Sequence, residues 1–226
     1  MKIKSLKYFL FAVFVCIFSK NNAQNNNDFR AWSSLEISGN LSKKLEISLK
    51  AQSRFNQQFT QPRGIYYSLD ASRKIKKKWS LEGGLRYKTS RTFSSLRIRM
   101  GISKKFKLNK IDLSIRGFYQ IHWDEFGLHE NYGNIRVLSW RFRFQVERKI
   151  IKHLILTLSS EPLWRAENKS VFLRRVRNSL GLSYEIDKKM SVEASYLFQP
   201  QFNPYRKINI LSLSISYDIS PPKKKK

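Results

Sequence analysis

Alternation of apolar and polar residues is the feature that most limits what this chain can fold into. A period of two places successive side chains on opposite faces of a β-strand, and it recurs from Asp28 almost to the end of the chain. No segment carries apolar residues at the spacing of an amphipathic helix, so we expect an all-β fold. The expected strands cover residues 29–38, 45–56, 64–75, 79–89, 95–105, 110–123, 134–148, 153–163, 171–186, 190–200 and 208–219.

The length of these segments favours a membrane. Most contain about 10 to 14 residues, whereas soluble strands cluster at about 5–6 and a tilted membrane-crossing strand needs about 9–11. The apolar phase carries no charge at the strand centres, and aromatic residues concentrate near strand ends, as in interfacial girdles. Alternation by itself also fits a soluble β-sandwich. The aromatic residues near strand ends are Trp79, Tyr87, Tyr119, Trp123, Trp140, Tyr184, Phe198 and Tyr217.

Connection lengths alternate as well. Short connections near 39–44, 76–78, 106–109, 149–152 and 187–189 take turns with longer ones near 57–63, 90–94, 124–133, 164–170 and 201–207. Outer-membrane barrels show this asymmetry between periplasmic turns and extracellular loops, so we expect an antiparallel up-and-down transmembrane β-barrel. Because bacterial single-chain barrels normally have even strand numbers, we expect 10 to 12 strands. Eleven segments are predicted, so either one strand is miscounted, around Ile135–Leu138 or in 161–175, or the 24–38 segment does something other than span.

The N-terminus is typical of a secretory signal peptide. Three lysines precede the uncharged apolar run from Tyr8 to Phe18, and Asn21-Asn22-Ala23 offers a cleavage site before Gln24. Cys16 lies in this segment, so the exported chain would contain no cysteine. We expect a signal peptide at 1–23, a barrel at 24–220 and a lysine-rich tail at 221–226.

The formal net charge of +28 would ordinarily suggest nucleic acid as a partner. Export argues against that partner, and the lysines concentrate at the predicted short turns and in the tail. We therefore expect a cationic periplasmic rim that can meet anionic headgroups or other polyanions, and no nucleic acid. The clearest lysine clusters are Lys43-Lys44, Lys76-Lys77-Lys78, Lys104-Lys105, Lys188-Lys189 and Lys223 to Lys226.

The polar phase of the strands carries many ionisable residues, which a barrel would turn toward its interior. Two interpretations stay open: a narrow pore with mild anion preference, or an interior plugged by ion pairs across strands. The constriction would involve Arg97, Arg99, Arg141 and Arg143. The full set of pore-lining candidates is Arg97, Arg99, Arg116, Arg141, Arg143, Glu82 and Glu147.

One cluster resembles a ligand site. His122, Asp124 and His129 lie close together in sequence, and imidazole with carboxylate suits zinc. The spacing matches no standard site, so we favour a solvated loop and expect no metal. No phosphate-loop, serine-hydrolase or zincin motif is present. We expect no cofactor and no enzyme activity, with a lipid-acyl-modifying enzyme using His122 as the alternative.

Three stretches carry a family resemblance: Asp28 to Trp32, the hairpin Asn40 to Leu49 that leads into Gln52 to Asn56, and Trp140 to Gln145. With them the chain resembles the exported proteins of Bacteroidota grouped as domain of unknown function 2490. The resemblance implies an outer-membrane barrel and supplies no activity. We expect a barrel of the Gram-negative outer membrane, surrounded by lipid, that is structural or a narrow channel for small solutes. The other alternative is an exported soluble β-sandwich that binds anionic polymers.

Overall fold

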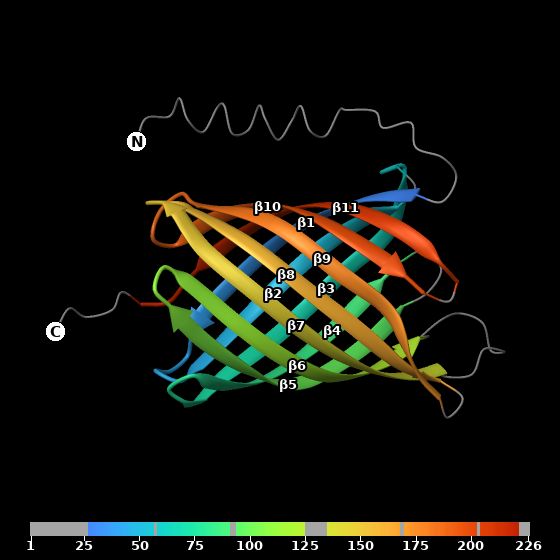
Figure 1. Cartoon of the computed structure of the whole chain (residues 1–226), viewed down its shortest axis with the longest axis horizontal. Helices are drawn as coiled ribbons and strands as arrows, with labels where there is room; N and C mark the ends of the chain where they lie inside the picture. The colour runs from blue at the N-terminus through green and yellow to red at the C-terminus, as the bar shows by residue number, and fades with distance from the viewer. Residues whose placement is uncertain are drawn as a thin grey trace.

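Eleven β-strands among the described residues close into one barrel in the computed structural model (Figure 1). The structure describes residues 27–56, 58–90, 94–124, 135–167, 170–202 and 204–221. The strands are β1 (Asn27–Asn40), β2 (Leu45–Asn56), β3 (Gln61–Lys76), β4 (Trp79–Thr89), β5 (Ser95–Leu108), β6 (Ile111–Asp124), β7 (Ile135–Ile151), β8 (Leu154–Glu167), β9 (Ser170–Glu185), β10 (Met190–Gln201) and β11 (Arg206–Asp218).

All eleven predicted strands are present, and β2 and β4 have the predicted bounds. The number of eleven lies within the expected range of 10 to 12, and no predicted strand was miscounted. In an up-and-down sheet neighbouring strands run in opposite directions, so the first and last of an odd number run the same way. The barrel accordingly closes through a parallel pair, β1 with β11, in which Arg30 lies beside Ile210 and Ile37 beside Tyr217.

The parallel seam also carries side-chain contacts. The Ser34 hydroxyl donates to the Ser214 hydroxyl at 3.0 Å, and the Ile219 backbone N–H donates to the Ser38 carbonyl at 2.8 Å. The Asn40 side chain donates to the Ser220 hydroxyl at 2.7 Å. These contacts tie the end of the chain to β1 and complete the barrel.

The apolar phase faces outward. Leu35 and Met100 are each 61% exposed and Leu49 is 57% exposed, although they are large hydrophobic residues. The opposite phase, with polar residues such as Gln52 and Gln120, is buried inside. A sandwich would bury its apolar phase between two sheets, so the β-sandwich alternative is wrong. Among the described residues no helix is long and apolar enough to cross a membrane.

The two ends of the barrel differ. The short turns lie at the end of the barrel where β11 ends, on the left in Figure 1. We call this end the turn end and the opposite one the loop end. At the turn between β9 and β10 the Asp187 carboxylate accepts the backbone N–H groups of Lys189 and Met190, at 2.6 and 2.8 Å. These hydrogen bonds favour the ionised form and lower the pKa of Asp187.

Candidate functional site: the barrel interior

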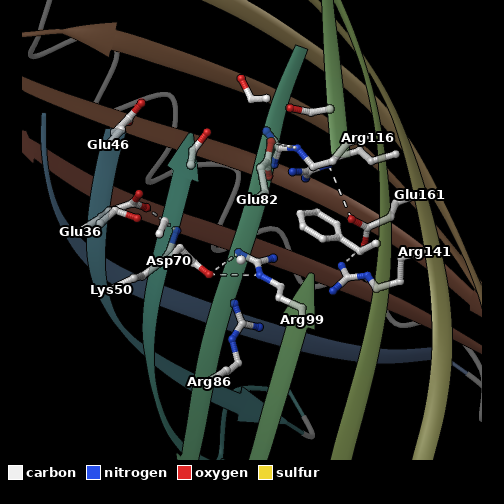
Figure 2. A pocket seen from close by; sticks show the side chains of 18 of the residues that line it. Glu36, Glu46, Lys50, Asp70, Glu82, Arg86, Arg99, Arg116, Arg141 and Glu161 are labelled. Atoms are coloured by element: carbon white, nitrogen blue, oxygen red, sulfur yellow. Dashed lines mark hydrogen bonds and ion pairs between the residues drawn. The ribbon is translucent and has the colours of Figure 1, made fainter. Parts of the chain in front are cut away.

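A cavity of about 500 Å³ lies inside the barrel. It extends from the turn end, where Glu46 and Lys76 line it, toward the middle of the barrel, where Arg54, Arg86 and Arg141 line it (Figure 2). We call the turn-end part of this cavity the vestibule. Because its walls are the inward phase of the strands, its lining is mostly serine and ionised residues.

Three basic residues in the vestibule are paired with acids on nearby strands. Lys50 of β2 pairs with Glu36 of β1 at 3.1 Å, directly across the strand pair. Arg116 of β6 pairs with Glu82 of β4 at 3.2 Å. These pairs neutralise the lining locally.

The third vestibule pair depends on a glycine. Arg99 of β5 reaches Asp70 of β3 at 2.7 Å (Figure 2). Gly84 of β4 lies opposite both residues in the register. A Cβ at Gly84 would fall 1.9 Å from Asp70 Oδ1 and 2.9 Å from Arg99 Nε. The bridge therefore crosses β4 only because residue 84 has no side chain.

The inner end of the cavity is rich in arginine. Several guanidinium groups lie close enough to repel one another; Arg97, for example, is within electrostatic reach of Arg86, Arg141 and Arg177. We call the following inward arginines the arginine layer: Arg54, Arg86, Arg97, Arg141, Arg143, Arg175 and Arg177.

Glu161 of β8 is the acid at the centre of this layer. Its carboxylate accepts a hydrogen bond from Arg141 Nη2 and one from Arg177 Nη1 at 3.4 Å, and Arg143 Nε lies 3.8 Å away. The Glu161 and Arg141 side chains are only 7% and 9% exposed. Among the described residues no other ion pair joins an acid to a member of the arginine layer.

Neutral groups contact Arg54 and also Arg177. Arg54 donates two hydrogen bonds to Gln52 Oε1, at 2.8 and 2.6 Å, and its guanidinium carbon lies 4.1 Å from the Trp32 ring centre and 3.9 Å from that of Tyr66. Arg177 donates to Gln199 Oε1. Ring faces and amide oxygens stabilise a cation without cancelling its charge.

An apolar cluster lies against this layer. Trp32, Leu197, Ile208 and Ile210 form the one buried hydrophobic cluster found among the described residues, and both isoleucines are 0% exposed. Ile208 and Ile210 share the inward phase of β11 with Ser212 and Ser214, which line the cavity. The loop-end half of the interior therefore contains a packed apolar core, which the sequence analysis did not anticipate.

The structure places all seven predicted pore-lining candidates on the inward face, because each lies opposite another inward residue in the register. The five that line the cavity are Glu82, Arg99, Arg116, Arg141 and Arg143. Arg97 and Glu147 are outside that lining, and Glu147 accepts a hydrogen bond from Gln145. Whether any of them lines a conducting pore stays a prediction.

Sequence reasoning missed Glu161, the acid that contacts three arginines of the interior. Its signal was available, since Glu161 follows Ile155, Thr157 and Ser159 at a spacing of two on the predicted strand 153–163. Glu161 is directly opposite Arg177 in the register. Continuing the inward-facing alternation from Ser159 to Glu161 would have placed this carboxylate inside the barrel with the arginines.

The histidine cluster is only partly described. His122 lies on the inward phase of β6, opposite Val137 of β7, Asp124 ends β6, and His129 is outside the described residues. Within the part of the chain that the structure describes, no three His, Cys, Asp or Glu side chains are grouped to hold a metal. The expected lack of metal, cofactor and enzyme activity stays a prediction, as do the signal peptide at 1–23 and the role of the tail.

Comparison with known proteins gives one match. A family model described as "Protein of unknown function (DUF2490)" matches residues 29–209, which include all of β2 to β10 and most of β1. No match to a curated protein is found. The match therefore covers most of the barrel and supplies no reaction, ligand or partner.

Proposed function

Because the chain belongs to the family described as Protein of unknown function (DUF2490), whose description assigns no activity, we propose a function from the barrel itself. The protein is an outer-membrane β-barrel that is closed toward its loop end and opens as a vestibule toward the periplasm. It serves as a structural or solute-binding barrel and is not an open channel at rest.

The main support for a membrane location is that the barrel exposes apolar side chains outside and encloses charged ones inside. Large apolar side chains lie exposed around the outside, among them Leu81, Ile115 and Leu213, while ion pairs lie inside. A soluble protein rarely exposes an apolar surface larger than a few hundred Å². Strands of 11 to 17 residues are also long enough to cross a hydrocarbon layer, for which about 9–11 suffice.

The direction of the barrel follows from its two ends. Outer-membrane barrels keep short turns in the periplasm, so the turn end with its lysines would face the inner leaflet. Lys104, for example, lies 4.6 Å from the ring centre of Trp79 at this end, where an aromatic ring and a cation both suit the headgroup region. The same rim would attract anionic headgroups.

The closure of the loop-end half rests on its packing. An aqueous pore would keep water beside inward side chains, yet Ile208 and Ile210 are fully buried and Leu163 and Leu197 are 5% and 7% exposed. A barrel of about eight strands is just filled by side chains, and about sixteen leave a channel. Eleven strands fit a partly filled interior.

Cell fractionation with surface proteolysis tests the location. The protein should sediment with outer membranes, require detergent for extraction and be cleaved from outside only in its loops. Recovery from the periplasm without detergent would contradict the proposal. A variant with Leu49, Leu69 and Leu81 replaced by Gln should fail to insert, while Ser48→Gln, on the inward phase of β2, should still reach the membrane.

A further inference from the structure

The charge of the interior is unevenly distributed along the barrel. In the vestibule, Lys50, Arg99 and Arg116 each have an acid within 3.2 Å. In the arginine layer, the carboxylate of Glu161 serves three guanidinium groups, while Arg54 and Arg86 bond to the neutral acceptors Gln52 and Ser68. Buried charges are stable when paired, so the layer as described has an uncompensated positive charge.

The layer also has hydrogen-bond donors without acceptors. The Nε atoms of Arg97, Arg141 and Arg143 are buried and have no hydrogen-bond partner. Arg141 as a whole is 7% exposed and lines the cavity together with Arg143. Buried polar atoms are usually satisfied, so the Nε donors of Arg141 and Arg143, which line the cavity, favour an acceptor at its inner end.

The position of the layer sets what can reach it. Arg54, Arg86, Arg141, Arg143 and Arg177 line the same cavity of about 500 Å³ that opens past Lys76 at the turn end. A water molecule occupies about 30 Å³ of liquid, so a small anion with part of its hydration shell fits. In the vestibule Lys50, Arg99 and Arg116 are already paired with carboxylates, so they attract the anion less than the arginine layer does. The lysines at the mouth would raise the local concentration of the anion.

We propose that the arginine layer is a binding site for a small oxyanion of the phosphate or sulfate type, which enters through the vestibule. Guanidinium groups present parallel N–H donors that match two oxygens of such an ion and remain protonated at any physiological pH. The anion supplies both features that the layer lacks, a negative charge and acceptors for the free N–H groups. This inference goes beyond the proposed function and does not depend on which membrane holds the barrel.

Calorimetric titration of the folded full-length barrel in detergent tests the site. Sodium phosphate and sodium sulfate are titrated at constant ionic strength, with sodium chloride as the reference. One saturable site per barrel is expected for both oxyanions. The absence of saturable heat with either oxyanion in the wild-type protein would overturn the proposal.

Substitutions locate the ion. Arg86→Gln removes a guanidinium that takes part in no ion pair among the described residues. Arg143→Gln removes one whose Nε lies 3.8 Å from the Glu161 carboxylate and has no hydrogen-bond partner. Each should weaken phosphate binding about tenfold or more, as the loss of a charge-assisted hydrogen bond predicts. Arg73→Gln, on the exposed outer phase of β3, is the matched control and should change the affinity less than about twofold.

A rim variant separates the layer from the lysines. If Lys76, Lys77 and Lys78 are replaced by Gln, saturable binding at the layer should persist. Phosphate binding that is lost in this variant but unchanged in Arg86→Gln and Arg143→Gln would place the ion at the rim and overturn the proposal. Circular dichroism of every variant confirms a folded barrel before titration.

Discussion

The two halves of the barrel interior stabilise inward-facing positive charge in different ways. In the vestibule Lys50, Arg99 and Arg116 each have a carboxylate of their own, as Arg99 has Asp70. In the arginine layer Arg141, Arg143 and Arg177 share Glu161, and Arg54 is held between two aromatic rings. The difference indicates that these three vestibule cations are neutralised one by one, whereas the arginine layer has more guanidinium groups than carboxylates.

The largest effect is expected at Glu161. Glu161→Gln leaves the buried Arg141 without its carboxylate, and breaking one side of a buried ion pair costs about 3–5 kcal/mol. Urea unfolding of the barrel in lipid vesicles, followed by tryptophan fluorescence, measures the loss. Glu36→Gln is the vestibule counterpart; its pair is 27–28% exposed, so its loss should cost about 1 kcal/mol or less. Equal losses would remove the distinction between the two halves.

The second-largest loss of stability is expected at Gly84, which lies between Asp70 and Arg99 in the sheet. Gly84→Ala places a Cβ against the Asp70 carboxylate, and such overpacking costs about 1–3 kcal/mol. The same unfolding measurement applies. Gly83→Ala is the matched control, because its Cβ would point outward and meet nothing closer than 4.0 Å; it should be neutral or slightly stabilising. A neutral Gly84→Ala would mean that Asp70 and Arg99 do not bridge across β4.

A smaller effect is expected from Arg54→Lys. Lysine keeps the charge but loses the planar contact with Trp32 and Tyr66 and the paired hydrogen bonds to Gln52. We expect a loss of about 1 kcal/mol in the unfolding free energy. Arg116→Lys in the vestibule should cost less, because the attraction to Glu82 survives in lysine. If Arg116→Lys lowers the unfolding free energy more than Arg54→Lys does, stacking on aromatic rings does not stabilise the arginine layer.

The strands were predictable because a period of two, sustained over long segments, leaves little choice of structure. Their inward and outward faces followed from the same period. The parallel closure of β1 on β11 was not predictable in this way, since alternation shows which face a residue takes and not which strands meet. Predicting this parallel pair would have required taking the odd number of eleven predicted strands as correct.

The interior was only partly predictable. Its arginines were identified by phase, but their partners depend on which strands lie two apart around the barrel, as for Arg99 and Asp70 across Gly84. Ile208 and Ile210 were not expected inside, because apolar residues were assigned to the lipid face as a class. The packing of the loop-end half against Trp32 is a tertiary feature that periodicity cannot supply.

Conductance in a planar lipid bilayer tests the closed loop-end half most directly. The purified wild-type barrel should insert without sustained current steps. A variant with Trp32, Ile208 and Ile210 replaced by Ala removes the buried cluster and should produce steps of uniform size. Sustained, uniform steps from the wild-type protein would contradict the account.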